Sequence, residues 1–152
     1  MEITEIWELV NYIKEKYSDA NKIVEIGIGF NPRISYLLKE ELPKTEIIAV
    51  DKNLKSLEYV SRKCPRIKVK QDDIFTPDLD IYRHASLILS CNPPDELIEE
   101  LCKISEIVKA DLLIRPLIDE GSYMFRQQDN WIGIRKSKYL FFLKPCKKRG
   151  ME

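Results

Sequence analysis

The stretch VEIGIGFNP, residues 24–32, decides which fold the chain is expected to adopt. An apolar run that begins at Lys22 leads into an acidic residue and then into two glycines one position apart. From Pro32 onward the apolar residues have the spacing of a helix. A strand that turns through glycines into a helix is typical of the first unit of an open α/β sheet, in which the turn contacts a ligand.

Segments of strand and helix alternate through most of the remaining sequence. Parallel neighbours in a sheet must be joined by a crossover long enough to hold a helix. Short unbroken apolar runs also fit strands that are covered on both faces. The sequence therefore predicts an α/β fold with a doubly wound, mostly parallel sheet. The predicted parallel strands are residues 22–26, 46–50, 66–69, 85–90 and 110–116, and the predicted helices are residues 32–42, 54–63 and 95–108 after an N-terminal helix whose buried face carries Ile3, Ile6, Trp7, Val10, Ile13 and Tyr17.

The end of the chain departs from this alternation. WIGIR and KYLFFLKP are separated only by Lys136 and Ser137, which is too short for a parallel crossover and predicts an antiparallel hairpin. The second of these strands is apolar on both faces, so we expect it inside the sheet, next to one edge. We thus expect about seven strands in a single Rossmann-like domain. Its parts are an N-terminal helix (1–20), parallel βα units (21–116), the hairpin (130–144) and a basic tail (145–152).

Composition and charge limit the classes of function. The chain has 25 basic and 25 acidic residues, so no overall field attracts it to nucleic acid or to an anionic membrane. No apolar run approaches the ~20 residues of a membrane span, and we expect a cytoplasmic protein. The four cysteines are scattered without a C-x-x-C pair, and His84 is the one histidine, so we expect no metal site.

Two resemblances arise from these motifs. The five parallel strands, the closing hairpin and an acidic residue two positions before the first glycine resemble the class I S-adenosylmethionine-dependent methyltransferase fold, over about residues 21–144. That resemblance implies S-adenosylmethionine as a cofactor. The sequences VEIGIGFNP and DDIF (residues 72–75) also resemble the corresponding motifs of a small archaeal family of uncharacterised proteins. This second resemblance implies no activity.

The loop after the first strand is the predicted cofactor loop. Gly27 and Gly29 allow positive φ and close approach of a ligand to the backbone. The Glu25 carboxylate would repel a pyrophosphate, whereas it suits a cationic amine or sulfonium. The methyltransferase pattern, acidic-x-G-x-G-x-G, is followed as Glu25, Gly27 and Gly29, with Asn31 at the last position. Asn31 either stands in for glycine or, with Pro32, only opens a helix as its N-cap.

Three further residues have roles implied by the resemblance. Asp51 ends the second strand and matches the acid that binds the ribose hydroxyls. Asp73 matches the acid that contacts adenine, and Ile74 the residue that packs on its ring. The alternatives are a solvated strand-end carboxylate at Asp51 and a turn cap at residues 72–73.

SCNPPDEL, residues 90–97, follows the fourth predicted strand. It resembles the N-P-P-aromatic motif of amino-directed methyltransferases, but Asp95 replaces the aromatic residue and removes the face that would meet a developing cation. The alternative assigns Asn92 to the N-cap of the next helix. Cys91 and Asn92 are still the catalytic candidates, because their position would face the methyl group of the cofactor.

Two classes of function remain open. The first is an enzyme that binds S-adenosylmethionine and transfers its methyl group to an unknown acceptor. The second is a non-catalytic Rossmann-like module that binds a ligand or partner, which the short chain favours because no insertion is available to build a lid. The basic residues of KPCKKRG, residues 144–150, could contact nucleic acid phosphates, although a solvated tail is the favoured interpretation.

Overall fold

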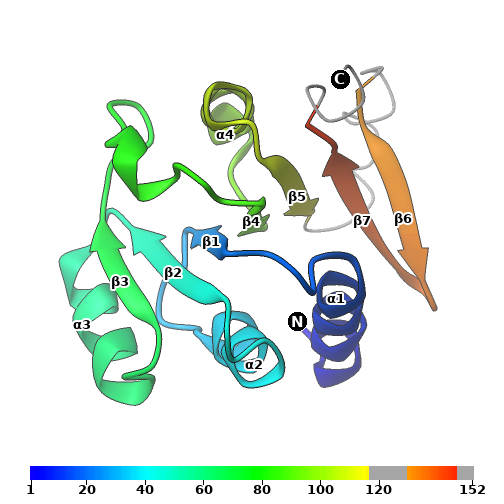
Figure 1. Cartoon of the computed structure of the whole chain (residues 1–152), viewed down its shortest axis with the longest axis horizontal. Helices are drawn as coiled ribbons and strands as arrows, with labels where there is room; N and C mark the ends of the chain where they lie inside the picture. Colours follow the sequence, from blue (N-terminus) through cyan, green and yellow to red (C-terminus); the bar gives the residue numbers. More distant parts are fainter. Residues whose placement is uncertain (117–129, 147–152) are drawn as a thin grey trace.

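The computed structural model describes residues 1–116 and 130–146, and in these residues seven strands form one sheet (Figure 1). The strand order is β3-β2-β1-β4-β5-β7-β6. The elements are α1 (Ile3–Lys16), β1 (Lys22–Ile26), α2 (Arg33–Glu41), β2 (Glu46–Asp51), α3 (Leu54–Lys63), β3 (Lys68–Gln71), the 3-10 helix η1 (Leu79–Ile81), β4 (Leu87–Cys91), α4 (Asp95–Val108), β5 (Asp111–Arg115), β6 (Ile132–Lys136) and β7 (Tyr139–Lys144).

Strand direction confirms the predicted doubly wound fold. Strands β1 to β5 pair in parallel, and β7 pairs antiparallel with both β5 and β6. The strand β7 lies inside the sheet, as its apolar faces predict. The chain winds from β1 outward through β2 to β3, then returns to β4 on the other side of β1. This reversal places the carboxyl ends of β1 and β4 at the point where open α/β sheets bind ligands.

Helices cover both faces of the sheet and form two apolar cores (Figure 1). On one face α1, α2 and α3 pack against the strands, and on the other face lie α4 and the η1 segment. The predicted buried face of α1 is partly wrong. Ile3 and Trp7 are 57% and 38% exposed, whereas Leu9 is fully buried. The helix is therefore rotated so that Leu9, rather than these two residues, faces the sheet.

Two strands begin two residues after their predicted starts. The strand predicted at residues 85–90 is β4, which begins at Leu87. The prediction of residues 66–69 was wrong by two residues, because β3 begins at Lys68. Ile67 precedes the strand but is buried in the core with residues of the helices. Its apolar side chain therefore suggested a strand where the chain is not yet paired. Within the described residues no helix combines the length and the apolarity that crossing a bilayer requires.

Candidate functional site

The glycines of the loop after β1 are needed for its shape. Gly27 and Gly29 have φ values of +80° and +56°. The Gly27 and Ile28 N–H groups donate to the Val50 carbonyl at 2.8 and 3.1 Å, so the loop turns along the end of β2. A Cβ on Gly29 would meet nothing within 4 Å, which means that open space borders this backbone. The loop therefore leaves room for close approach of a ligand.

Asn31 does not need to replace glycine for conformational reasons. Among the described residues the positive-φ positions are Gly27, Gly29, His84, Asn92, Lys109 and Ser137, so φ at Asn31 is not positive. The Asn31 Oδ1 atom accepts a bond of 3.1 Å from Arg33 Nε and a long one of 3.4 Å from the Arg33 N–H. Helix α2 begins at Arg33. The N-cap prediction for Asn31 is therefore wrong by one position, because Pro32 is the N-cap residue of α2. Asn31 bonds to the first residue of the helix and also lines the cleft described next.

A cleft of about 190 Å³ lies at the carboxyl ends of β1 and β4. Its lining comes from the N-terminus and α1, from the end of β1 with its loop and the start of α2, and from the ends of β4 and β5. The predicted site residues that line it are Glu25, Gly27, Asn31, Cys91 and Asn92.

Glu25 is the buried carboxyl group of this cleft. Its side chain is on β1, only 4% of the residue is exposed, and its Oε1 atom accepts a 2.6 Å hydrogen bond from the Ser35 hydroxyl of α2. Burial raises the pKa of Glu25 to about 7, and the bond from Ser35 offsets part of that rise. A carboxyl group in a cleft whose pKa is raised close to neutral pH is typical of a functional site. A nearby cation would favour its ionised form.

Cys91 and Asn92 occupy the end of β4 in different ways. Burial, followed by the charge of Glu25, raises the pKa of the Cys91 thiol, so it is not a thiolate at neutral pH. Asn92 has φ +55°, and its N–H donates to the Arg115 carbonyl at 2.6 Å. The N-cap alternative for Asn92 is wrong, because α4 begins at Asp95 after Pro94. The left-handed backbone directs Asn92 to the cleft instead.

The residues predicted to bind the nucleoside part lie outside this cleft. The Asp51 carboxylate accepts from the Gly29 N–H at 2.8 Å and from the Asn53 N–H at 2.9 Å. Asp73 accepts from the Phe75 N–H at 3.0 Å, as in the predicted turn cap. Ile74 is 7% exposed and packs in the core on the α4 side of the sheet.

Comparison with known proteins places this sequence in a family. A sequence profile of the uncharacterised protein family UPF0146 matches residues 6–141. The chain belongs to the UPF0146 family. A UPF0146 protein of Methanocaldococcus jannaschii is 37% identical over 116 residues, which are 74% of this chain and 80% of that protein. One from Archaeoglobus fulgidus is 36% identical over 138 residues, 87% and 96% of the two chains.

Solved structures similar to this UPF0146 chain have the class I methyltransferase fold. A putative caffeoyl-CoA O-methyltransferase from Staphylococcus aureus has a TM-score of 0.70 at 8% identity, over 94% of this chain and 83% of that one. A TehB-like S-adenosylmethionine-dependent methyltransferase from Corynebacterium glutamicum has a TM-score of 0.65 at 11% identity, over 92% and 88%. At such identities the likeness shows the fold alone, which confirms the predicted Rossmann-like architecture.

The sequence interpretation missed an ion pair at the cleft of this UPF0146 protein. Arg115 ends β5 and lines the cleft, and its Nε and Nη2 atoms donate to both carboxylate oxygens of Glu5 at 2.7 and 2.9 Å. The bond raises the pKa of Arg115. Arg115 is the register partner of Cys91, so it lies at the same carboxyl edge of the sheet. Its position at the end of a predicted strand could therefore have identified it as a site residue. Its partner on α1 was not predictable from spacing.

Proposed function

We propose that this UPF0146 protein binds S-adenosylmethionine at the carboxyl ends of β1, β2 and β4, and that it transfers the methyl group to an acceptor yet to be identified. The observation that carries the proposal is Glu25, a buried carboxyl group with its pKa raised to about 7, in the cleft beside the glycine loop. A cationic ligand favours the ionised form of such a group. The methyltransferase-like fold of the chain is consistent with this ligand.

The residues at this edge fit the proposed cofactor. Glu25 would hold a cationic group, and the loop at Gly27 and Gly29 would contact the ligand through its backbone. The cleft of about 190 Å³ is smaller than the ~300–1,000 Å³ of ordinary small-molecule sites. The nucleoside part would therefore extend along the end of β2 toward Asp51 and Asp73. Each Asp51 oxygen already accepts one bond and retains capacity for another.

The main contribution of the protein to this reaction would be to position the methyl acceptor. S-adenosylmethionine supplies a methyl group on a sulfonium, and its transfer by in-line displacement depends mainly on orientation of the acceptor. The protonated Cys91 thiol gives the cleft an uncharged wall. The Asn92 amide can accept a hydrogen bond from an acceptor amine or hydroxyl and so orient it.

Titration with S-adenosylmethionine and S-adenosylhomocysteine tests the binding directly. Both ligands are expected to give a binding heat in calorimetry and to raise the melting temperature. Asp51→Ala should weaken binding by at least about tenfold, because it removes hydroxyl and loop contacts together. Gly27→Trp should abolish binding, with far-ultraviolet circular dichroism to show that it folds. Asp19→Ala, an exposed aspartate before β1, is the control. No binding at millimolar ligand would refute the proposal.

The affinity for a cationic ligand should depend on pH. Below a pKa of about 7, Glu25 is mainly protonated in the free protein and must lose its proton to pair with a cation. The affinity is therefore expected to rise from pH 6 to pH 8, and binding near pH 6.5 to release protons. Calorimetry in two buffers with different ionisation enthalpies measures this release, and Glu25→Gln should remove it. An affinity that falls with rising pH contradicts the role of Glu25.

A non-catalytic binding module is the second candidate function. The observation that favours it is the state of the catalytic candidates, since Cys91 holds its proton and Asp95 replaces the aromatic residue of the amine-directed motif. Such a module would bind S-adenosylmethionine without consuming it. Incubation of the protein with a methyl-tritiated cofactor and fractionated cell extract separates the two, because only an enzyme transfers label and forms S-adenosylhomocysteine.

A further inference from the structure

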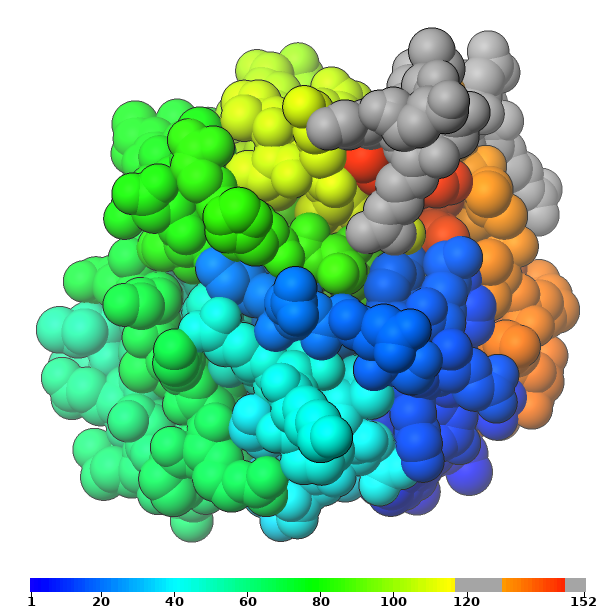
Figure 2. All heavy atoms as spheres, in the orientation of Figure 1, coloured from blue at the N-terminus to red at the C-terminus, as the bar shows by residue number. Residues whose placement is uncertain are grey.

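The surface formed by α3 and β3 carries a strong positive charge, although the whole chain has equal numbers of acidic and basic residues. From Lys52 to Gln71, Glu58 is the one acidic residue, and it is accompanied by seven basic residues, all of them exposed. This surface forms the left side of the molecule in Figure 2. Its basic residues are Lys52, Lys55, Arg62, Lys63, Arg66, Lys68 and Lys70.

Several of these charges are not balanced by neighbouring acids. Lys52, Arg66 and Lys68 form ion pairs with Asp73, Glu40 and Glu46 respectively. No carboxylate of the described residues lies within ion-pair distance of the other basic residues. These are Lys55, Arg62, Lys63 and Lys70. The surface therefore has charge available for an acidic partner.

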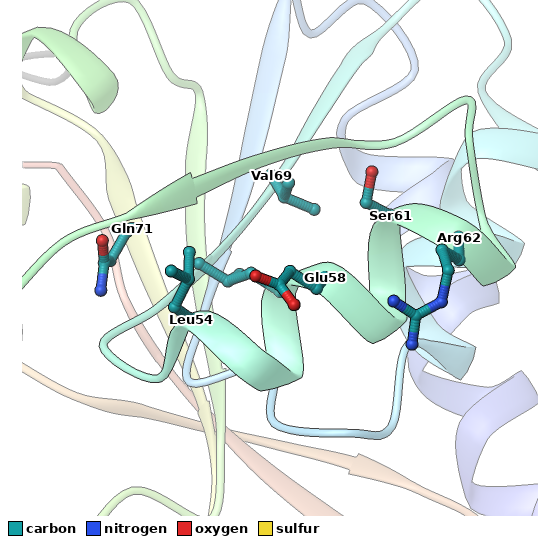
Figure 3. Close-up of a pocket in the computed structure, with 7 residues that line it drawn as sticks. Leu54, Glu58, Ser61, Arg62, Val69 and Gln71 are labelled. Atoms are coloured by element: carbon teal, nitrogen blue, oxygen red, sulfur yellow. The ribbon is translucent and has the colours of Figure 1, made fainter.

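A groove of about 400 Å³ runs along this surface between α3 and β3 (Figure 3). Leu54, Leu57 and Val69 give it an apolar lining, and Val69 projects from the strand toward the helix. Leu54 is 53% exposed, so part of this apolar lining faces solvent. Polar residues, including Arg62 at one end and Gln71 at the other, complete the lining.

The strand β3 is an edge of the sheet, since β2 is its one strand neighbour in the described part of the chain. The outer side of an edge strand presents backbone N–H and C=O groups that can pair with another strand. Successive side chains of a strand point to opposite faces. Val69 and Gln71 line the groove, which places Lys68 and Lys70 on the opposite face.

We propose that the β3 edge binds an extended segment of a partner protein whose side chains alternate between apolar and acidic. Paired with β3, such a segment would place its apolar side chains in the groove beside Leu54 and Val69 and its carboxylates beside Lys70. Backbone bonds supply affinity in this mode of recognition, and the alternating side chains supply specificity. Among the residues that the structure describes, no aromatic side chain lines the groove, so a stacked nucleic acid strand fits it less well.

Fluorescence anisotropy with labelled peptides tests this inference. The probe is an eight-residue peptide of alternating valine and glutamate, compared with a peptide that has the same composition in two blocks, VVVVEEEE. Because only the alternating peptide matches both faces of β3, it is expected to bind about tenfold more tightly. It should also slow amide hydrogen exchange within β3, which binding by charge alone would not do.

Matched variants locate the binding surface. Lys70→Glu is expected to weaken the alternating peptide about fivefold or more, because it replaces an attraction to the peptide carboxylates with a repulsion. Leu54→Ser should weaken it similarly through loss of the apolar contact. The controls are Lys16→Glu on α1 and Ile107→Ser on α4, since Ile107 is 55% exposed, close to the 53% of Leu54. The controls should change binding less than twofold.

Four outcomes would overturn the proposal. Equal binding of the block peptide would indicate non-specific charge attraction. Tighter binding of a uridine dodecamer, with the same sensitivity to Lys70→Glu, would make the surface a nucleic acid interface. Concentration-dependent dimerisation that Leu54→Ser abolishes would make the partner a second copy of the chain. No binding by any probe would leave the edge lysines with the role of preventing strand aggregation.

Discussion

Replacement of Glu25 by glutamine is expected to raise the free energy of unfolding by about 3 kcal/mol at pH 8 and to leave it nearly unchanged at pH 4. Burial raises the pKa of this carboxyl from 4.5 to about 7 in the folded protein. Below pH 4.5 the group is protonated in the folded and unfolded states alike. As the pH rises to 7, the unfolded chain ionises and the folded one resists, so stability falls. Glutamine keeps the shape of the side chain without the charge.

Urea unfolding of the wild type and of Glu25→Gln at pH 4, 6 and 8 measures this effect. Glu15→Gln, at an exposed position of α1, is the control and should show no comparable pH dependence. The stabilised variant is also expected to bind S-adenosylmethionine more weakly than the wild type. A substitution that improves stability and impairs binding is the pattern of a residue retained for function. If Glu25→Gln is no more stable at pH 8, burial does not control this carboxyl and the case for a cationic ligand fails.

Replacement of Arg115 by methionine is expected to lower the free energy of unfolding by about 3–5 kcal/mol, because it leaves the Glu5 carboxylate buried without a partner. The two side chains are 14% and 9% exposed, and both guanidinium bonds reach the same carboxylate. The pair connects α1 to the end of β5 beside the cleft. Its loss should also open the cleft and weaken ligand binding.

A double variant separates the missing partner from general disruption. Glu5→Met combined with Arg115→Met should recover most of the lost stability, since an apolar pair can replace a buried ion pair. Lys14→Met is the control, because the Lys14–Glu41 pair is 49% and 29% exposed and should contribute less than about 1 kcal/mol. Chemical denaturation of the four proteins at pH 7 gives the comparison. A double variant that is no more stable than Arg115→Met would show that the ion pair is not the source of the loss.

The interior of the sheet was predictable because burial on both faces leaves a continuous apolar signal. Residues 139–143 show it most clearly, since YLFFL has no polar face and β7 lies between β5 and β6. The edge strand β3 lacks this signal, because most of its side chains are exposed, and its prediction was displaced by two residues. Helix α1 was predicted correctly, but its rotation was not. Trp7 has the spacing of a core residue and is 38% exposed, since apolar spacing alone cannot distinguish a core face from a surface edge.

The candidate site was predictable where its residues share one loop. The acid and the two glycines follow a single strand, and both glycines have the positive φ expected of them. The Glu25–Ser35 bond joins β1 to a neighbouring helix, and helical spacing gave no sign of it. The Glu5–Arg115 pair joins residues 110 positions apart, and no local sequence pattern could predict that they are in contact. Ile74 could not be assigned to core or ligand from its sequence neighbours, and the structure buries it.

The position of α1 has a consequence for how the chain folds during synthesis. The apolar face of α1, including Ile6 and Leu9, packs in the same core as Phe141 and Leu143 of β7. The helix also lies beside the β6–β7 hairpin, and Thr4 bonds with the Tyr139 hydroxyl 135 positions later (Figure 1). Contacts so distant in sequence form late, because the intervening chain must first be ordered. On the ribosome, α1 therefore emerges long before β7, and the part of its packing that involves Phe141 and Leu143 forms only after translation has passed β7.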